Sequence, residues 1–363
     1  ASVRYALLGA FYTTLFFFAI ILLYISIGTL SMGTIAASLH FVKASELKEL
    51  ISLYRVEGIL FFVAISIWVS LFLSAIFPNH YWLPDAHAEA PTPASALLSG
   101  ATVLSGFYII TRILYTLIHG STLDMIVPIA KTILGILGIA SVIYGVIMVS
   151  VEEDIKRLLA YSTILNMGYI YMGLGIGTEL GIAAALLHAL NHAICKIMSF
   201  LSVGVLIKKY HTRNLYVLEG KGSETPITTT FLTFALLSLI GLPPMAGFFS
   251  KLMLFQAFME MRNYVYAVIL VIGTALSAYG YGRVLEHLWH PIHEPRPHRE
   301  KEHLSIPVLA SLIALTSIII IISIIQPQLN TILIETTSSL RTSAQNYINT
   351  TIELLQNIVH ESS

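Results

Sequence analysis

The chain has 363 residues, of which 56% are hydrophobic and 11% charged, and its mean hydropathy is +0.79. These values lie far outside the range of soluble globular domains and predict an integral membrane protein. The formal net charge is zero, so no basic surface indicates a nucleic-acid partner. The single cysteine, Cys195, lies within an apolar run, which excludes a disulfide framework, a cysteine-ligated iron–sulfur cluster and a CxxC redox pair.

Nine apolar runs with charges only near their ends predict transmembrane helices. Because a helix satisfies its own backbone groups in lipid, the sequence predicts an all-α polytopic membrane protein. Ala1 precedes the first run without a signal-peptide pattern, so we expect an N-terminus that is processed, truncated or set at a gene boundary. The predicted spans are Tyr5–Ile27, Glu57–Phe77, Ala96–Ile118, Met125–Val149, Arg157–Ile176, Leu180–Ile207, Thr228–Glu260 with a break, Tyr264–Leu288 and Ile306–Ile325.

The connections between these runs predict how the chain crosses the membrane. Residues Ser31–Arg55 mix apolar and charged positions and predict an interfacial amphipathic helix. The positive-inside rule predicts a cytoplasmic N-terminus and an external C-terminus, in a prokaryotic plasma membrane. The connections after the second, fourth, sixth and eighth spans carry most of the basic residues and are therefore placed in the cytoplasm. These residues are Lys156, Arg157, Lys208, Lys209, Arg213, Lys221, Arg296, Arg299 and Lys301.

A polar line along one predicted helix is the main candidate site. His188, His192 and Lys196 are four residues apart, which places them within an ~80° arc of one helix face. Lys196 lies near the middle of its span, where a charged side chain costs about 2.5–3.5 kcal/mol. Desolvated amines and imidazoles exchange protons readily, so the pattern predicts an ion relay. The alternative is that Lys196 pairs with another subunit and that the histidines only hydrogen-bond neighbouring helices.

Two segments carry proline where a continuous span is expected, Phe77–Gly100 and Leu239–Phe255. Proline removes a backbone donor and clashes with the preceding turn, so both segments are predicted to be broken helices. Paired broken helices in corresponding positions are typical of inverted-repeat transporters. The prolines that carry this prediction are Pro78, Pro84, Pro243 and Pro244.

Four motifs in this order resemble a known family. They read FPNHYWLPDAHAEAPTPASALLSG, EEDIKRLLAYSTILNMGYIYMGLG, HALNHAICK and GLPPMAGFFSK. This pattern is similar to the antiporter-like membrane subunits of respiratory complex I, a family that includes the Mrp sodium/proton antiporters and the membrane-bound hydrogenase group. The nine predicted spans fit the last nine of the family's usual fourteen.

The resemblance implies two inverted five-helix repeats, each contributing a half-channel, with buried lysines and histidines along the membrane midplane. Lys196 matches the central lysine of the family. His188 and His192 match the histidines that extend its water chain, and Lys251 matches the charged residue on the second broken helix. The alternative for Lys251 is a side chain that extends from a half-helix end to the headgroups.

The first break departs from the family pattern. The family's lysine stands seven residues before the motif histidine, which is His80 here, and that position is Leu73. The glutamate that pairs with this lysine lies on a helix that would precede Tyr5–Ile27, so both members of the pair are missing together. Losing one would leave an unpaired charge in lipid, whereas losing both is tolerable. We therefore expect an incomplete first repeat.

The remaining candidates carry weaker signals. Lys131 lies about two turns from Asp124 and either extends to the headgroups or joins the relay. Asp85 and His87 follow the first break, where we expect Asp85 to cap backbone donors. A loop rich in histidine has irregular spacing and prolines, so we expect a solvated loop and no metal site. Its histidines are His287, His290, His293, His298 and His303.

These features divide the chain into three parts. Residues 1–118 are the incomplete first repeat, and residues 119–290 are the second repeat with the polar relay and the second broken helix. Residues 291–363 contain the histidine-rich loop, the last transmembrane helix and a polar amphipathic tail that is expected to pack on a neighbour or the outer surface.

The sequence therefore predicts a cofactor-free, ion-translocating subunit of a multisubunit respiratory oxidoreductase complex, with no catalytic site of its own. Redox chemistry in partner subunits would drive protons, or sodium by exchange, through the Lys/His relay. We expect antiporter-like neighbours, a chain that supplies the missing N-terminal helices, and lipid as partners. The alternative is a structural or coupling subunit that has lost transport in its first half-channel. A self-sufficient antiporter is disfavoured, because a lone chain would leave open helix faces.

Overall fold

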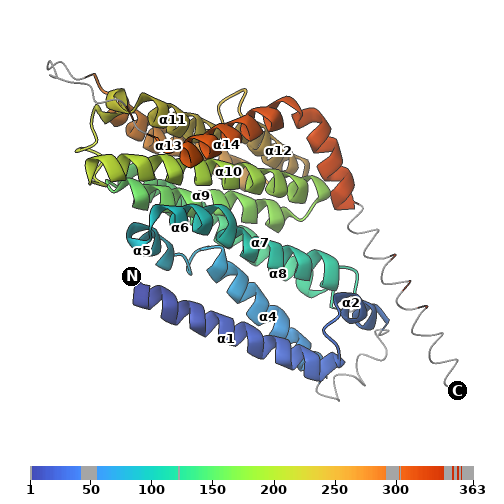
Figure 1. Ribbon diagram of the computed structural model, residues 1–363. Helices are drawn as coiled ribbons and strands as arrows, with labels where there is room; N and C mark the ends of the chain where they lie inside the picture. Colours follow the sequence, from blue (N-terminus) through green and yellow to red (C-terminus); the bar gives the residue numbers. More distant parts are fainter. Residues whose placement is uncertain are drawn as a thin grey trace, which may run out of the picture.

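The computed structural model describes residues 2–41, 55–121, 123–291, 302, 304–338, 346, 350 and 353. Within these ranges the chain is helical, with an isolated backbone bridge between Asp154 and Asn214 and no strand. The helices are α1 (Ser2–Ile27), α2 (Met32–Phe41), α4 (Arg55–Leu73), α5 (Trp82–Glu89), α6 (Thr92–Leu97), α7 (Val103–Arg112), α8 (Ile126–Val151), α9 (Ile155–Ile176), α10 (Glu179–Tyr210), α11 (Pro226–Ile240), α12 (Ala246–Glu260), α13 (Tyr264–Trp289) and α14 (Ile306–Ile324). Figure 1 shows them packed side by side, with α1 and α4 at one edge of the bundle and α11, α13 and α14 at the opposite edge.

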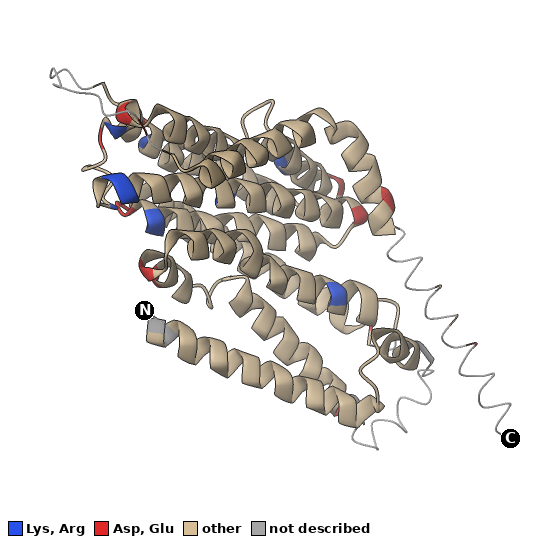
Figure 2. Ribbon diagram, in the orientation of Figure 1, with Lys and Arg blue, Asp and Glu red and all other residues tan. Residues whose placement is uncertain are grey.

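The helices coincide with the apolar runs predicted from the sequence. Among the described residues, six helices are long and apolar enough to cross a membrane, and two shorter apolar helices cover Glu57–Leu73 and Pro226–Ile240. Figure 2 shows that most charged residues lie near helix ends and in the connecting turns. The architecture is that of an all-helical polytopic membrane protein, so the predicted fold class is confirmed.

α9 forms the centre of the bundle, and nearly all of its side chains are buried. Its backbone meets that of α8 at two glycines, because a Cβ atom on Gly168 would lie 2.7 Å from the carbonyl oxygen of Gly138. Small residues at such crossings allow membrane helices to approach closely. α9 also packs against α10, and polar groups on the two helices meet inside the bundle.

Local signals set the ends of α9 and α10. The Asp154 carboxylate accepts hydrogen bonds from the backbone N–H groups of Lys156 and Arg157, at 2.9 and 3.2 Å, and caps the start of α9. α9 ends at Gly177, which adopts a left-handed φ of 67°. The Thr178 hydroxyl then caps α10, which continues for 32 residues and is therefore about 48 Å long. Residues near the middle of α10 therefore lie far from both of its ends.

Both predicted broken helices are present. α4 ends at Leu73, and a turn that contains Pro78 leads to α5, in which Pro84 stands in the first turn. α11 ends at Ile240, and a turn that contains Pro243 and Pro244 leads to α12. Each turn contains a cis peptide bond, before Pro78 and before Pro244 respectively.

Several predictions fall partly outside the described residues. α2 covers the first part of the predicted interfacial helix, whereas its remaining residues, 42–54, lie outside the described ranges, as do His293, His298 and His303. Beyond α14, residues 326–338 are helical, and most of the predicted polar tail is outside the described residues. The division of the chain into two repeats and a C-terminal part stays a prediction.

Candidate functional site

The three polar residues predicted on one helix face lie in the centre of the bundle. The side chains of His188, His192 and Lys196 are completely buried on α10. The helix that carries them packs against α6, α9, α11 and α12. Because an isolated buried charge is unfavourable, each of these groups must be judged by its contacts.

Lys196 is anchored to α9. Its ammonium group donates a hydrogen bond of 2.7 Å to the carbonyl oxygen of Leu159 and another to the hydroxyl of Ser162. The Ser162 hydroxyl in turn shares a hydrogen bond of 2.5 Å with the hydroxyl of Tyr281 on α13. Hydroxyl groups both donate and accept, so a charge on Lys196 is connected to a third helix.

The polar contacts continue from Tyr281 to α12. The Asn166 amide donates to the Tyr281 hydroxyl at 3.3 Å, and its carbonyl oxygen lies 3.2 Å from Nε2 of His188. On the other side of the imidazole, Nδ1 of His188 lies 2.9 Å from the hydroxyl of Ser250. A continuous chain of hydrogen bonds therefore joins Lys196 to the start of α12.

Lys251 lies at the far end of this chain, in the second break. Its ammonium group donates to the carbonyl oxygens of Leu239 and Ile240, at 2.9 and 3.1 Å, at the end of α11. It also lies 5.1 Å from the ring centroid of Tyr169, which makes an edge-to-face contact with His188. The break thus supplies the carbonyl groups that hold Lys251 inside the bundle. We call the hydrogen-bonded groups from Lys196 to Ser250, together with the adjacent Lys251, the polar chain.

Sequence reasoning missed the residues that connect the two lysines. Ser162 and Asn166 are four residues apart on α9 and therefore lie on one helix face, which is a weak signal of the same kind as the line on α10. Tyr281 and Ser250 carry no spacing signal, because their partners are distant in sequence. Only the packing of α9, α10, α12 and α13 reveals them.

His192 differs from its neighbours on α10. Neither of its ring nitrogens has a hydrogen-bond partner among the described residues. A π-helical turn from Leu98 to Thr102, between α6 and α7, covers this part of α10, and the hydroxyl of Ser99 in that turn bonds Thr163 on α9 at 2.6 Å. A Cβ atom on Gly100 would lie 3.1 Å from the carbonyl oxygen of Ala193, so this turn packs directly on α10.

The two histidines of the first break have different environments. His80 is buried in the turn before α5, and its ring lies 4.2 Å from the ring of Tyr144 and 5.4 Å from that of Phe77. His87 is completely buried on α5, and its ring stacks on Phe200 of α10 at 4.6 Å. His80 therefore faces α8, whereas His87 faces the helix that carries Lys196.

The remaining predicted residues lie at the ends of the bundle. Asp85 forms an ion pair of 3.0 Å with Arg157 at the start of α9. Lys131 lies 5.6 Å from the ring of Tyr115 and against Gly177, which follows α9. Measured along α9, Gly177 is about 27 Å from Leu159, the residue that binds Lys196. The structure thus places Lys131 at the other end of α9 from Lys196.

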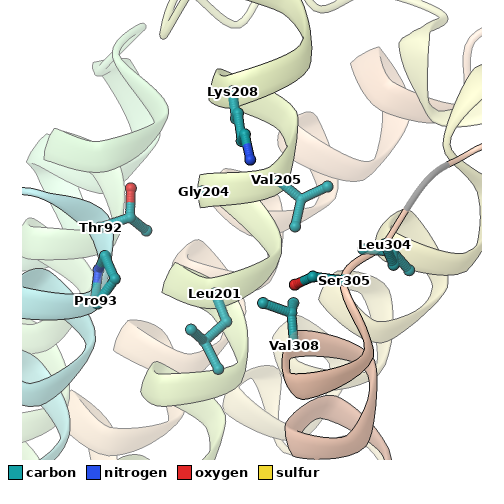
Figure 3. Close-up of a pocket in the computed structure, with 9 residues that line it drawn as sticks. All are labelled: Thr92, Pro93, Leu201, Gly204, Val205, Lys208, Leu304, Ser305 and Val308. Atoms are coloured by element: carbon teal, nitrogen blue, oxygen red, sulfur yellow. The ribbon is translucent and has the colours of Figure 1, made fainter.

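A separate pocket of about 320 Å³ lies near the C-terminal end of α10. Figure 3 shows the Lys208 side chain directed into it, with α6 on one side and the residues that lead into α14 on the other. The lining contains none of the residues of the polar chain, so the pocket lies beside that chain. Its lining residues are Thr92, Pro93, Leu201, Gly204, Val205, Lys208, Leu304, Ser305 and Val308. Among the described residues, no group of three His, Cys, Asp or Glu side chains could hold a metal ion.

The fold and the buried polar chain define a class of protein: a polytopic helical membrane protein with two interrupted helices and charged groups enclosed in its centre. Residues 1–277 match the family model described as NADH:quinone oxidoreductase/Mrp antiporter, transmembrane region. The chain belongs to this family, and the resemblance inferred from the four motifs is confirmed.

Curated relatives are subunits of NADH-quinone oxidoreductases. Subunit N of the NADH-quinone oxidoreductase of Desulforudis audaxviator is 31% identical over 291 residues, which cover 80% of this chain and 55% of the relative. Subunit M of the enzyme of Rickettsia prowazekii is 31% identical over 282 residues, which cover 76% of this chain and 53% of the relative. The chain therefore spans about half the length of the curated relatives it matches.

Solved structures share the fold. A chain of the membrane-bound sulfane sulfur reductase, an archaeal respiratory membrane complex, superposes with a TM-score of 0.79 at 25% identity, covering 96% of this chain and 67% of that chain. A chain of the Mrp complex from a Dietzia species superposes with a TM-score of 0.78 at 19% identity, covering 95% and 69%. The latter likeness concerns the fold alone.

Proposed function

We propose that this chain moves protons across the membrane through the polar chain, as an antiporter-like subunit of a multisubunit respiratory oxidoreductase complex. The observation that carries the proposal is the series of hydrogen bonds that leads from the buried Lys196 to Ser250, the residue next to the buried Lys251. Membership of the NADH:quinone oxidoreductase/Mrp antiporter family supports it. The relay residues are Lys196, His188, His192 and Lys251, and Lys131 extends the path at the far end of α9.

The chemistry of each group suggests its role in this transfer. The hydroxyls of Ser162 and Tyr281 share one hydrogen bond, and each can pass a proton because a hydroxyl group can both accept and donate. The imidazole of His188 can take up a proton at one ring nitrogen and release it at the other. An amide does not readily carry a proton, so Asn166 acts as a positioning residue that holds Tyr281 and His188 in line.

Partner subunits complete the proposal. Redox chemistry in other subunits would change the field around Lys196 and Lys251 and so drive proton transfer between them, or sodium movement by exchange. The charged turns at the start of α9 and the end of α10 would face the cytoplasm, and the C-terminus the outside, according to the positive-inside rule. The electron carriers would reside in the partners.

Replacing Lys196 tests the proposal. The complex that contains Lys196→Ala, reconstituted into liposomes, should lose proton transport while electron transfer continues. Tyr281→Phe should reduce transport several-fold, because it removes the hydroxyl that connects Ser162 to Asn166. Tyr171→Phe is the matched control, since this buried tyrosine of α9 bonds Ser74 at 2.8 Å, beside the first break. Unchanged transport in Lys196→Ala would contradict the proposal.

A second candidate function is a structural or coupling subunit that has lost transport in its first half-channel. Leu73 at the end of α4 favours it, because an aliphatic side chain stands where the related family has a lysine. On this view Lys196→Ala would leave pumping by the complex unchanged, but would weaken its assembly.

A further inference from the structure

His87 on α5 is a buried histidine whose ring is positioned by stacking. Its side chain is completely buried, and neither Nδ1 nor Nε2 has a hydrogen-bond partner among the described residues. The ring is held by stacking on Phe200, with ring centroids 4.6 Å apart and planes inclined by 17°. A phenylalanine would make the same stacking contact without burying two polar atoms. Packing alone therefore does not explain an imidazole at this position.

The position of His87 connects two parts of the molecule. Phe200 follows Lys196 by one turn on the same face of α10, so His87 lies over the continuation of the polar line. Lys196 and Lys156 are the cationic groups whose charges act on the His87 ring. On its own helix, Asp85 and Glu89 are the neighbouring charges, and Asp85 is paired with Arg157.

The far side of His87 leads to a charged rim at the surface. The Lys156 ammonium donates to the carbonyl oxygen of Ala90 at 2.6 Å, and the Arg213 guanidinium donates to that of Ala88. We define the cationic rim as Lys156, Arg157 and Arg213. The Arg157 and Arg213 side chains are 42% and 39% exposed, so the rim reaches the surface of the protein. The residues directly after His87 are thus fixed to this rim.

We propose that His87 is a proton-carrying residue that connects the cationic rim to Lys196. The inference deepens the proposed function and rests on it. The neutral imidazole would accept a proton at one ring nitrogen from the rim side and release the proton on its other nitrogen to the neutral amine of Lys196. No other bond forms or breaks, and the imidazole returns to its neutral form in the other tautomer. In this way the first broken helix, which has Leu73 at the lysine position, still serves the relay of the second repeat.

Two substitutions separate proton transfer from packing. His87→Phe keeps the ring stacked on Phe200 but cannot carry a proton, so proton transport should fall at least tenfold while the complex assembles normally. Phe200→Leu removes the stacking partner but leaves the imidazole, so it should lower thermal stability and retain most transport. The measurement is the rate of pH change in pyranine-loaded liposomes that contain the whole complex. Electron transfer through the complex is the driving force, and potassium with valinomycin dissipates the opposing membrane potential.

Chemical rescue provides a readout that a purely structural role would not change. In His87→Ala, imidazole added to the buffer should restore part of the transport, whereas it should not restore transport in Lys196→Ala. Wild-type transport in His87→Phe, or a loss in His87→Ala that imidazole leaves unchanged and Phe200→Leu reproduces, would overturn the inference. If Lys196→Ala itself transports normally, the proposed function fails, and the two failures are therefore distinguishable.

Discussion

The two broken helices have the same backbone arrangement, but different side chains stabilise the two breaks. In each, a helix ends inside the bundle, a turn with a cis X-Pro bond follows, and a second helix begins. Each break frees carbonyl groups that need donors, because water is not available in the hydrocarbon region. The two breaks therefore differ in the side chains that supply these donors.

At the second break the donor is charged, and at the first it is neutral. The Lys251 ammonium donates to the carbonyl oxygens of Leu239 and Ile240. At the first break the indole N–H of Trp82 donates to the carbonyl oxygen of Phe72 at 3.1 Å. A neutral indole satisfies a carbonyl but cannot change its charge, whereas an ammonium group can lose a proton. The donor at the first break therefore has a fixed charge, whereas the donor at the second break is ionisable.

The largest effect that would test this contrast is expected at Lys251. Lys251→Met keeps most of the apolar volume but removes the ionisable group, so proton transport should fall about 10²-fold, the typical contribution of a positioned proton-transfer group. The measurement is proton transport by the reconstituted complex, with its assembly checked by size-exclusion chromatography. Retained transport in a fully assembled complex would mean that the charge at the second break serves structure only.

The close packing of the second break gives the next prediction. A Cβ atom on Gly247 would lie 1.7 Å from the carbonyl oxygen of Ser238, so the two halves of the broken helix touch through their backbones. Gly247→Ala should therefore lower stability by about 1–3 kcal/mol, the usual cost of overpacking. Thermal unfolding in detergent measures this loss. Gly282→Ala on α13, where no atom lies within 4 Å of the added group, is the matched control and should be close to neutral.

Much of the fold could be predicted from the sequence, because the bilayer imposes simple rules on it. Apolar runs located the helices, and the prolines at positions 78, 243 and 244 located both breaks. The spacing of His188, His192 and Lys196 correctly placed all three on one buried face of α10. Helical periodicity fixes such a face within one helix without any knowledge of its neighbours.

The connections between helices could not be predicted in this way. Tyr281 meets Ser162 across 119 positions of sequence, and no periodicity links such distant residues. His87 and Lys131 appeared in the sequence as similarly weak candidates, yet the structure places His87 against α10 and Lys131 beside the turn after α9. These differences depend on helix packing, which the sequence of a single helix does not encode.

The smallest predicted effect concerns the neutral donor of the first break. Trp82→Phe removes the indole N–H from the carbonyl oxygen of Phe72, where the Trp82 side chain is only 4% exposed. The loss should be about 1 kcal/mol of stability, because a buried acceptor loses one of its donors while the aromatic contact largely remains.

A matched control for this change is Trp289→Phe. The Trp289 indole also donates a hydrogen bond, to the Thr233 hydroxyl at 3.0 Å, but its side chain is 41% exposed and other polar groups can replace the bond. Thermal unfolding should therefore show a smaller loss for Trp289→Phe than for Trp82→Phe, and proton transport by the complex should be unchanged in both. A loss of transport in Trp82→Phe comparable to that in Lys251→Met would show that the neutral donor of the first break also governs proton movement, and the contrast between a fixed and an ionisable donor would then be wrong.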